Sequence, residues 1–339
     1  MYQHKMVGAM STLRSVVGLN SSDSMVVPSR VPKRLPKKPK PKAKKAEPPV
    51  VDASRATSLG DDGLDALLLP GLPPTNDSVP QAGPVPLLIP YREEPSYCLN
   101  DITDDWSIAR VVTEKKFKGW EKVFQTAQHD LLETSGLIEE DEKSWSTCLP
   151  HRRDIFKIFS MVQPPEIKVV ILDQAPYPRM IGDHPEAVGM SYGGHPDNPV
   201  PASLKNIYKE LARSIPGYRT PGHGDLTHWV LQGVFLLNMS LTVRINQPNS
   251  HSEVWMGFII PVLEAIGQAN PECVFMLWGG DAQKAVKYIS SRSKVLACNH
   301  PSPRSVMMGG KECFIGCGHF VKCNEILVSQ KKTPIDWQS

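Results

Sequence analysis

Residues 167–178 have the sequence IKVVILDQAPYP, in which an apolar segment is followed directly by a polar turn. The first half of this stretch, from Ile167 to Leu172, is apolar and rich in β-branched side chains, a composition typical of a strand buried on both faces. The polar segment that follows begins at Asp173, where a parallel sheet usually presents its ligand-binding groups, at the carboxyl end of a strand. We therefore expect a functional site to begin at Asp173.

Strand and helix patterns alternate along the chain beyond this point. Further apolar strands are expected at residues 235–238, 273–278 and 294–298. Amphipathic helices are expected at residues 203–211 (with Ser203 as the N-cap), 254–266, 282–289 and 320–328. This alternation predicts an α/β fold, namely a single domain with a short parallel β-sheet flanked by helices on both faces. The polar and glycine-rich turns at three strand ends are expected to converge on one site.

Residues 1–95 differ in composition from the rest of the chain. They hold 15 of the 32 prolines, and the run RVPKRLPKKPKPKAKK at residues 30–45 carries nine Lys or Arg and no acid. Such a segment buries too little apolar surface to offset its ordering entropy. We expect residues 1–95 to form a disordered Pro/Lys-rich extension and residues 96–339 to form the folded domain. The formal net charge is +3, so subtracting the nine charges of this run leaves −6 for the remainder.

The extension leaves several interpretations open. The basic run fits a nuclear import signal or a nucleic-acid tether, and equally a solvated linker. The first 22 residues carry Lys5 and Arg14 and no acid, which is also compatible with a mitochondrial presequence. Residues 62–69 (DGLDALLL) form an acidic and apolar segment, which could dock on a protein partner as a short helix. No run of about 20 apolar residues is present, so no membrane span is expected.

The seven cysteines lack the spacing of a small disulfide scaffold, which indicates a reducing compartment. Four potential zinc ligands lie close together in the sequence: Cys313, Cys317, His319 and Cys323. The paired CxxC knuckles typical of zinc sites are missing, so we expect no metal here.

A series of short motifs, in a fixed order between Val169 and Trp337, resembles the family 1 uracil-DNA glycosylases. The pieces are the Gln174–Tyr177 turn and the segments PASLKNIY (201–208), PGHGDL (221–226), LLNMSLTVR (236–244), SH (250–251), LWG (277–279), HPSP (300–303), GCGHF (316–320) and PIDW (334–337). Each is weak alone, but their number and order make an unrelated fold improbable. Pro178 and Arg304 are more similar to the members found in large DNA viruses, such as poxviruses.

The resemblance implies roles for five residues in base recognition and bond cleavage. Asn238 reads N3–H and O4 of uracil, because an amide both donates and accepts hydrogen bonds. Tyr192 stacks on the extruded base, Tyr177 excludes the thymine methyl group, and Gln174 belongs to the same substrate-binding set. His300 stabilises the negative charge that develops on uracil O2.

Contacts with the DNA backbone are implied at Ser203, Gly279, Gly280 and Ser302, since backbone amides and small hydroxyls approach phosphates closely without carrying charge. Such contacts suit a domain that is not basic overall. Arg304 occupies the place of the family's usual leucine wedge, where an arginine can stack on bases.

The chain departs from the family at the residue that activates water. Ala175 stands where the family has an aspartate, and an alanine cannot polarise a water molecule. Asp173 stands where the family has a glycine, two residues earlier and on the same side of an extended segment. We hypothesise that Asp173 partly substitutes for the missing base.

The resemblance implies a monomeric DNA repair enzyme that flips uracil out of single- or double-stranded DNA and hydrolyses its N-glycosidic bond without metal or cofactor. The alternative is a catalytically impaired DNA-binding or replication accessory protein, because of Ala175. We expect a nuclear location, with a mitochondrial form also possible, and contacts with replication or repair proteins through the extension.

Overall fold

The computed structural model describes residues 99–338 apart from 145–146, 309 and 311. The expected extension at residues 1–95, with its basic run, lies outside the described residues. The element order of the described part is an alternation of strands and helices, as the sequence pattern predicts.

A four-stranded parallel sheet forms the centre of the domain. Its strands are β2 (Val169–Asp173), β5 (Val234–Asn238), β7 (Val274–Trp278) and β8 (Lys294–Cys298), in the order β5-β2-β7-β8. The first three strands are buried at every residue, which explains their uninterrupted apolar sequences, whereas β8 is an edge strand with mostly exposed residues. The expected strand at 167–172 begins two residues later, and its last residue is Asp173.

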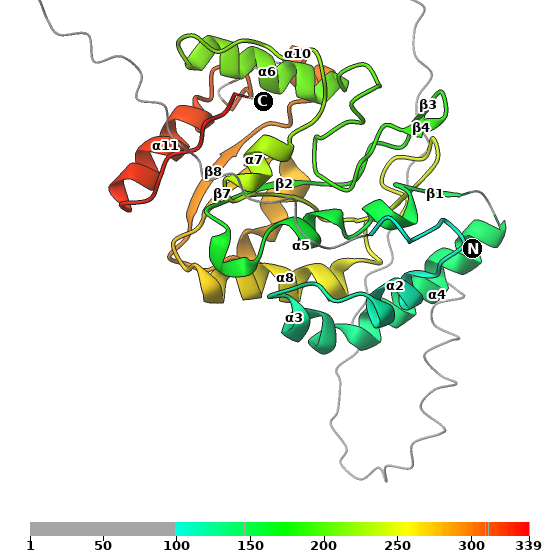
Figure 1. Cartoon of the computed structure of the whole chain (residues 1–339). Coiled ribbons are helices and arrows are strands. Elements are labelled where there is room, and N and C mark those ends of the chain that lie inside the picture. Colours follow the sequence, from blue (N-terminus) through cyan, green and yellow to red (C-terminus); the bar gives the residue numbers. More distant parts are fainter. Residues whose placement is uncertain (1–98, 145–146, 309, 311, 339) are drawn as a thin grey trace, which may run out of the picture. The chain divides into compact units, whose positions relative to one another are not determined.

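Helices cover both faces of this sheet, with α8 on one side and α6 and α11 on the other (Figure 1). The α-helices are α2 (Ile108–Glu114), α3 (Glu121–Thr126), α4 (Gln128–Ser144), α5 (Lys157–Met161), α6 (Ala202–Ser214), α7 (Thr227–Leu231), α8 (Met256–Ala269), α9 (Gly280–Gln283), α10 (Pro303–Met308) and α11 (His319–Ser329). Three short 3-10 helices are η1 (Arg152–Asp154), η2 (Pro164–Glu166) and η3 (Lys284–Tyr288). No helix of the described part is both long and apolar enough to cross a membrane.

Two details differ from the expectations. The N-cap of α6 is Pro201, and Ser203 lies inside the first turn of the helix. Proline suits this position because it needs no hydrogen-bonded N–H at the start of a helix. The single helix expected at 282–289 is instead divided into α9 and η3.

Aromatic side chains fill the core on the α8 side of the sheet. Phe235 of β5 stacks on Trp120 with ring centroids 5.2 Å apart, and Phe159 meets it edge-on at 5.4 Å. Phe258 of α8 packs against Phe124 and Phe159. Such edge-to-face contacts hold the helices against the sheet at defined positions, because offset aromatic pairs prefer particular geometries.

Two further sheets have two strands each. β1 (Cys148–Leu149) pairs with β6 (Val243–Arg244), and β3 (Met180–Ile181) pairs with β4 (His184–Pro185), both antiparallel. The second hairpin lies in the segment between Tyr177 and Tyr192.

Candidate active site

The proposed site residues come from neighbouring strand ends. Asp173 ends β2 and lies directly beside Asn238, the last residue of β5. β7 ends at Trp278 and is followed by Gly279, and β8 ends two residues before His300. Because all four strands are parallel, their carboxyl ends meet at one edge of the sheet. The sheet thus brings Asp173, Asn238, Gly279 and His300 to the same edge.

Asp173 and His300 form a hydrogen-bonded pair at this edge. The distance from His300 Nε2 to Asp173 Oδ1 is 3.0 Å, and the backbone N–H of Gln174 also donates to Oδ1 at 2.8 Å. The Asp173 side chain is 7% exposed and that of His300 is 28% exposed. The carboxylate is therefore nearly buried, while the imidazole keeps a face open to a ligand.

The backbone of Ser302 defines the tautomer of His300. The Ser302 N–H donates to His300 Nδ1 at 2.9 Å. A backbone N–H can only donate, so Nδ1 must accept, and in the neutral ring the hydrogen sits on Nε2. His300 thus presents a single N–H, which points at the Asp173 carboxylate in this structure.

Asn238 carries an unsatisfied acceptor. Its side chain is buried, at 6% exposure, and its Oδ1 accepts no hydrogen bond from any residue in the described part of the chain. A buried polar atom without a protein partner is costly, so a water or a ligand that donates to it is favoured. A base with a donor at the matching edge would satisfy this oxygen.

The two tyrosines lie against this group. The Tyr192 ring lies 5.4 Å from that of Trp278 and 5.8 Å from that of His300, on a backbone with φ of +62°. The Tyr177 hydroxyl donates to the Tyr192 carbonyl at 3.3 Å. Burial, and then the nearby Asp173 charge, raise the pKa of both phenols, so both stay neutral hydrogen-bonding groups at physiological pH.

The expected phosphate-binding residues lie around the same edge. Gly279 adopts φ of +98°, and a Cβ there would lie 3.0 Å from His300 Cβ, so only glycine fits without displacing the imidazole. Gly280 begins α9 and is exposed, and Ser302 is half-buried. Ser203 lies close enough to Tyr177 to oppose the rise in that phenol's pKa.

One residue that anchors the site was missed as a separate candidate. Asn206 of α6 is buried and its Nδ2 donates to the Pro301 carbonyl at 2.8 Å, which ties the His300 loop to the helix that carries Ser203. The signal was present in the sequence, since Asn206 lies within the quoted segment 201–208, but the sequence does not show which loop its side chain reaches.

The remaining site residues differ in what they offer. Ala175 is half-buried and contributes only a methyl group, so the carboxylate beside His300 belongs to Asp173. Arg304 is exposed on α10, next to Met307 and Met308, whose exposed fractions are 87% and 78%. This segment presents one cation and two apolar side chains to solvent.

Comparisons with known proteins agree with this geometry. Residues 159–328 match the model of the uracil DNA glycosylase superfamily. A uracil-DNA glycosylase of Francisella tularensis subsp. tularensis is 44% identical over 190 residues, which cover 56% of this chain and 83% of that protein. A uracil-DNA glycosylase of Francisella tularensis subsp. novicida is 43% identical over 190 residues, with the same coverage of both chains.

A solved structure gives the same result for the fold. The crystal structure of mimivirus uracil-DNA glycosylase superposes with a TM-score of 0.63 at 28% identity, covering 68% of this chain and 89% of that one. The family model spans half of the chain, and the Francisella relatives are matched over most of their length. This chain belongs to the uracil-DNA glycosylase family.

Proposed function

We propose that this protein excises uracil from DNA by hydrolysing the N-glycosidic bond, with Asp173 supplying the carboxylate that the family places at position 175. Family membership supports the reaction. The hydrogen-bonded pair of Asp173 and His300 carries the assignment of the carboxylate, because it puts a buried acid beside the imidazole at the strand edge.

Base recognition falls to Asn238. Uracil offers N3–H as a donor and O4 as an acceptor, and the unsatisfied Oδ1 of Asn238 can accept the first while its amide N–H donates to the second. Tyr192 and Tyr177 form the apolar walls around the base, and the Gln174 turn closes the pocket on the β2 side. A uracil base flipped out of the DNA would thus supply the hydrogen-bond donor that Asn238 Oδ1 lacks.

His300 stabilises the leaving base. When the C1′–N1 bond breaks, its electron pair stays on uracil and negative charge collects on O2. The Nε2–H of His300 then donates to O2, which in the transition state is a stronger acceptor than a neutral carbonyl oxygen. Ser302 keeps the hydrogen on Nε2 through its bond to Nδ1.

Asp173 acts on the sugar side. Once the Nε2–H turns to O2, the carboxylate is free to face the positive charge that develops on the sugar and to accept a proton from the attacking water. General-base catalysis of this kind contributes about 10²–10⁴-fold in rate. The water oxygen bonds to C1′, and its proton passes to Asp173.

The DNA backbone is held by short groups rather than by a cationic face. Ser203, Gly279, Gly280 and Ser302 offer hydroxyls and backbone amides to phosphates. Arg304 fills the space vacated by the base. Both single- and double-stranded uracil-containing DNA can be held in this way.

The basic run at residues 30–45 provides a second, non-specific contact with nucleic acid, and it serves as a nuclear import signal. Replication or repair proteins would meet the chain through the extension.

The competing function is a protein that binds uracil-containing DNA without turnover, and Ala175 is the observation that favours it. The experiment that separates the two measures free uracil released from a single-stranded uracil-containing oligonucleotide, with protein in excess over DNA. We expect complete release in a single turnover. Retained binding of the oligonucleotide without any release would overturn the enzymatic function and leave the binding function.

A further inference from the structure

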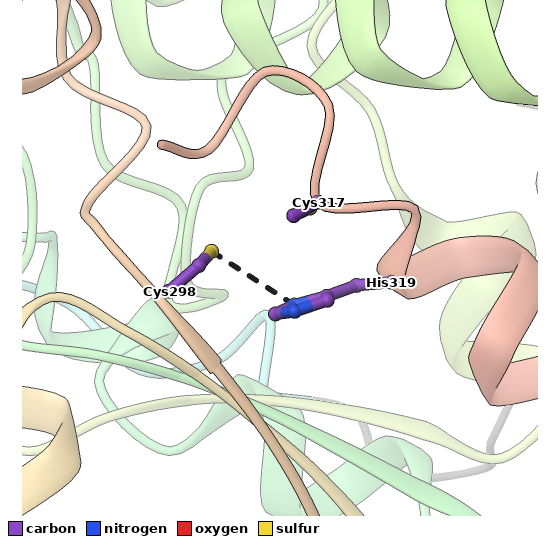
Figure 2. A group of neighbouring side chains, drawn as sticks. All are labelled: Cys298, Cys317 and His319. Atoms are coloured by element: carbon purple, nitrogen blue, oxygen red, sulfur yellow. Dashed lines mark hydrogen bonds between the residues drawn. The ribbon is translucent and has the colours of Figure 1, made fainter. Parts of the chain in front are cut away.

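Two cysteines and a histidine gather directly behind the His300 loop. Cys298 is the last residue of β8, Cys317 precedes α11, and His319 is the first residue of α11. One ligand atom from each, including both Sγ atoms, lies within 4.8 Å of the others. Figure 2 shows the Cys298 sulfur directed at the His319 ring, with Cys317 beside both. The glycosylase chemistry proposed above uses none of these three side chains.

Hydrogen bonds from neighbouring residues fix the histidine in this group. The indole N–H of Trp278 donates to His319 Nδ1 at 3.1 Å, and Cys298 Sγ lies 3.9 Å from the same nitrogen. Since the indole can only donate, the Nδ1 lone pair is already engaged. A metal ion bound at Nδ1 would have to displace this buried bond and leave the Trp278 N–H without its acceptor.

The group also differs from the zinc set that the spacing suggested. Among the described residues it unites Cys317 and His319 with Cys298 and includes neither Cys313 nor Cys323. The three ligand atoms would form an incomplete shell for zinc, which prefers four. The chemistry that the present geometry favours is therefore that of two neighbouring thiols.

The two thiols differ in access and in acidity. Cys298 is 3% exposed, whereas Cys317 is half-buried, with its Sγ 3.9 Å from Glu210 Oε1, so Cys317 is the more accessible of the two. A hydrogen bond from the Cys298 thiol, together with His319, lowers the pKa of Cys317, while the same contact and burial raise the pKa of Cys298. The accessible sulfur is thus the better nucleophile and the buried one its protonated neighbour.

We infer that Cys298 and Cys317 form a reversible disulfide when the protein meets a hydroperoxide. The Cys317 thiolate attacks the peroxide, so that an S–O bond forms, the O–O bond breaks, and hydroxide leaves. Cys298 then attacks the sulfenic sulfur of Cys317; an S–S bond forms, the S–O bond breaks, and the departing hydroxide takes the Cys298 proton as water. The two sulfurs supply the two electrons that reduce the peroxide.

The path to this bond is short. The sulfurs lie within 4.8 Å, and a disulfide requires about 2.05 Å. The Cys298 backbone is held by the N–H of Gly279 and the side chain of Gln283, both of which donate to its carbonyl at 2.9 Å. The Cys317 segment is held as well, because the N–H groups of Gly316 and Gly318 donate to the buried Glu210 carboxylate at 2.7 and 2.9 Å. We therefore expect the bond to form by rotation of the two side chains with a small local shift of the backbone.

The test treats the full-length, reduced protein with hydrogen peroxide at neutral pH, blocks free thiols with iodoacetamide, and maps peptides by mass without reduction. We expect loss of two hydrogen atoms from the whole protein, a peptide pair joined through Cys298 and Cys317, and full reversal by dithiothreitol. The matched control is Cys323→Ser, a buried cysteine outside the group, which should form the same bond.

A second variant keeps the test decisive. In Cys298→Ser, the Cys317 sulfenic acid has no resolving thiol, so it should accumulate and be trapped by dimedone. The inference is wrong if peroxide joins another pair of cysteines, if Cys317 stays reduced in both proteins, or if a copurified zinc ion protects both thiols until it is chelated. None of these outcomes depends on whether the protein releases uracil.

Discussion

At the scale of single residues, the site differs from the family pattern by the position of one carboxylate. Asp173 and Ala175 are two residues apart at the end of β2, and residues at this separation in an extended chain point to the same face. In this structure, however, residues 174–175 form a bend beyond the strand, so strand alternation does not fix where the Ala175 methyl points, and the Asp173 carboxylate is placed by the carboxyl end of β2 itself. The hydrogen bond between this carboxylate and His300 Nε2 is the structural result of that placement.

Asn238 is the residue whose change tests base recognition most simply. We expect Asn238→Ala to lower the single-turnover rate of uracil release by about 10²–10³-fold, the usual cost of removing one well-placed hydrogen-bonding group. Binding of a uracil-free oligonucleotide should stay unchanged, because Asn238 is buried at a strand end. An unaltered rate of uracil release in this variant would show that another group reads the base.

Sequence reasoning identified most of these residues but not how they interact. The order of motifs predicted Asn238, His300 and Tyr192 as site residues. The sheet brings Asn238 and His300 to one edge, and the Tyr192 ring, from the segment after β4, lies 5.8 Å from that of His300. The bond between Asp173 and His300 spans 127 positions, and strand alternation reveals only which face a side chain occupies. The partner of a side chain on that face depends on loop conformation, which the Ser302 N–H and Asn206 control here.

At the scale of elements, a buried ionic network joins α4 to β6 and to the loop before α8. Asp141 of α4 accepts two hydrogen bonds from Arg244 of β6 and lies 3.1 Å from His251 Nε2. Thr242 contacts His251 Nδ1 at 2.9 Å, and the Trp255 indole donates to Thr242 at 2.8 Å. The network attaches the helical layer to the segment that follows Asn238.

This network makes stability depend on pH. Burial opposes ionisation of Asp141, but Arg244 and His251 outweigh it and hold the pKa of Asp141 below its usual 3.8; burial lowers the pKa of His251 below 6.5. In both cases the unfolded state binds more protons as the pH falls, so the free energy of unfolding decreases below pH 6.5 through His251 and below 3.8 through Asp141.

We expect Asp141→Asn to lower the free energy of unfolding by about 1–3 kcal/mol at pH 7, because it takes the carboxylate from the partly buried Arg244 guanidinium. It should also flatten the loss of stability below pH 3.8. Urea unfolding from pH 3 to 8 measures both effects, with Asp105→Asn, an exposed aspartate, as the control. Equal stability of the two variants at pH 7 would show that the network contributes little.

Local sequence patterns predicted the boundaries of the strands better than those of the helices. The four strands of the sheet were predicted to within two residues, because uninterrupted apolar runs and their polar ends mark both boundaries. The start of α6 was predicted less well. A serine before an apolar repeat is a common N-cap, but Pro201 takes that position and leaves Ser203 to face Tyr177. The preference of serine for the N-cap therefore did not predict the position of Ser203.

At the scale of the whole molecule, charge is divided along the chain. The nine positive charges of residues 30–45 exceed the total of +3, so the rest of the chain is negative. The folded domain itself is nearly neutral, because residues 96–339 hold 25 Lys or Arg and 26 Asp or Glu. It therefore offers no long-range attraction to DNA, and the short groups at the strand edge act only at contact. We propose that the basic run at residues 30–45 supplies the long-range attraction that this edge lacks.

The fold as a whole was predictable because its signals repeat. The same α/β arrangement is predicted by each apolar strand, by the helix that follows it and by the polar residues at its end. Family motifs also recur at each strand end. The group of Cys298, Cys317 and His319 was not predictable in this way. Its members come from two distant segments, and the sequence spacing pointed to Cys313 and Cys323 instead.

We propose that uracil release depends on the Asp173 carboxylate in place of one at position 175. The most direct test measures single-turnover uracil release by the wild type, Asp173→Asn and the double variant Asp173→Asn/Ala175→Asp, with Asp105→Asn as the matched control. We predict that Asp173→Asn is slower by about 10²-fold or more and that the second substitution restores part of the rate. Release by Asp173→Asn at the wild-type rate would contradict the claim.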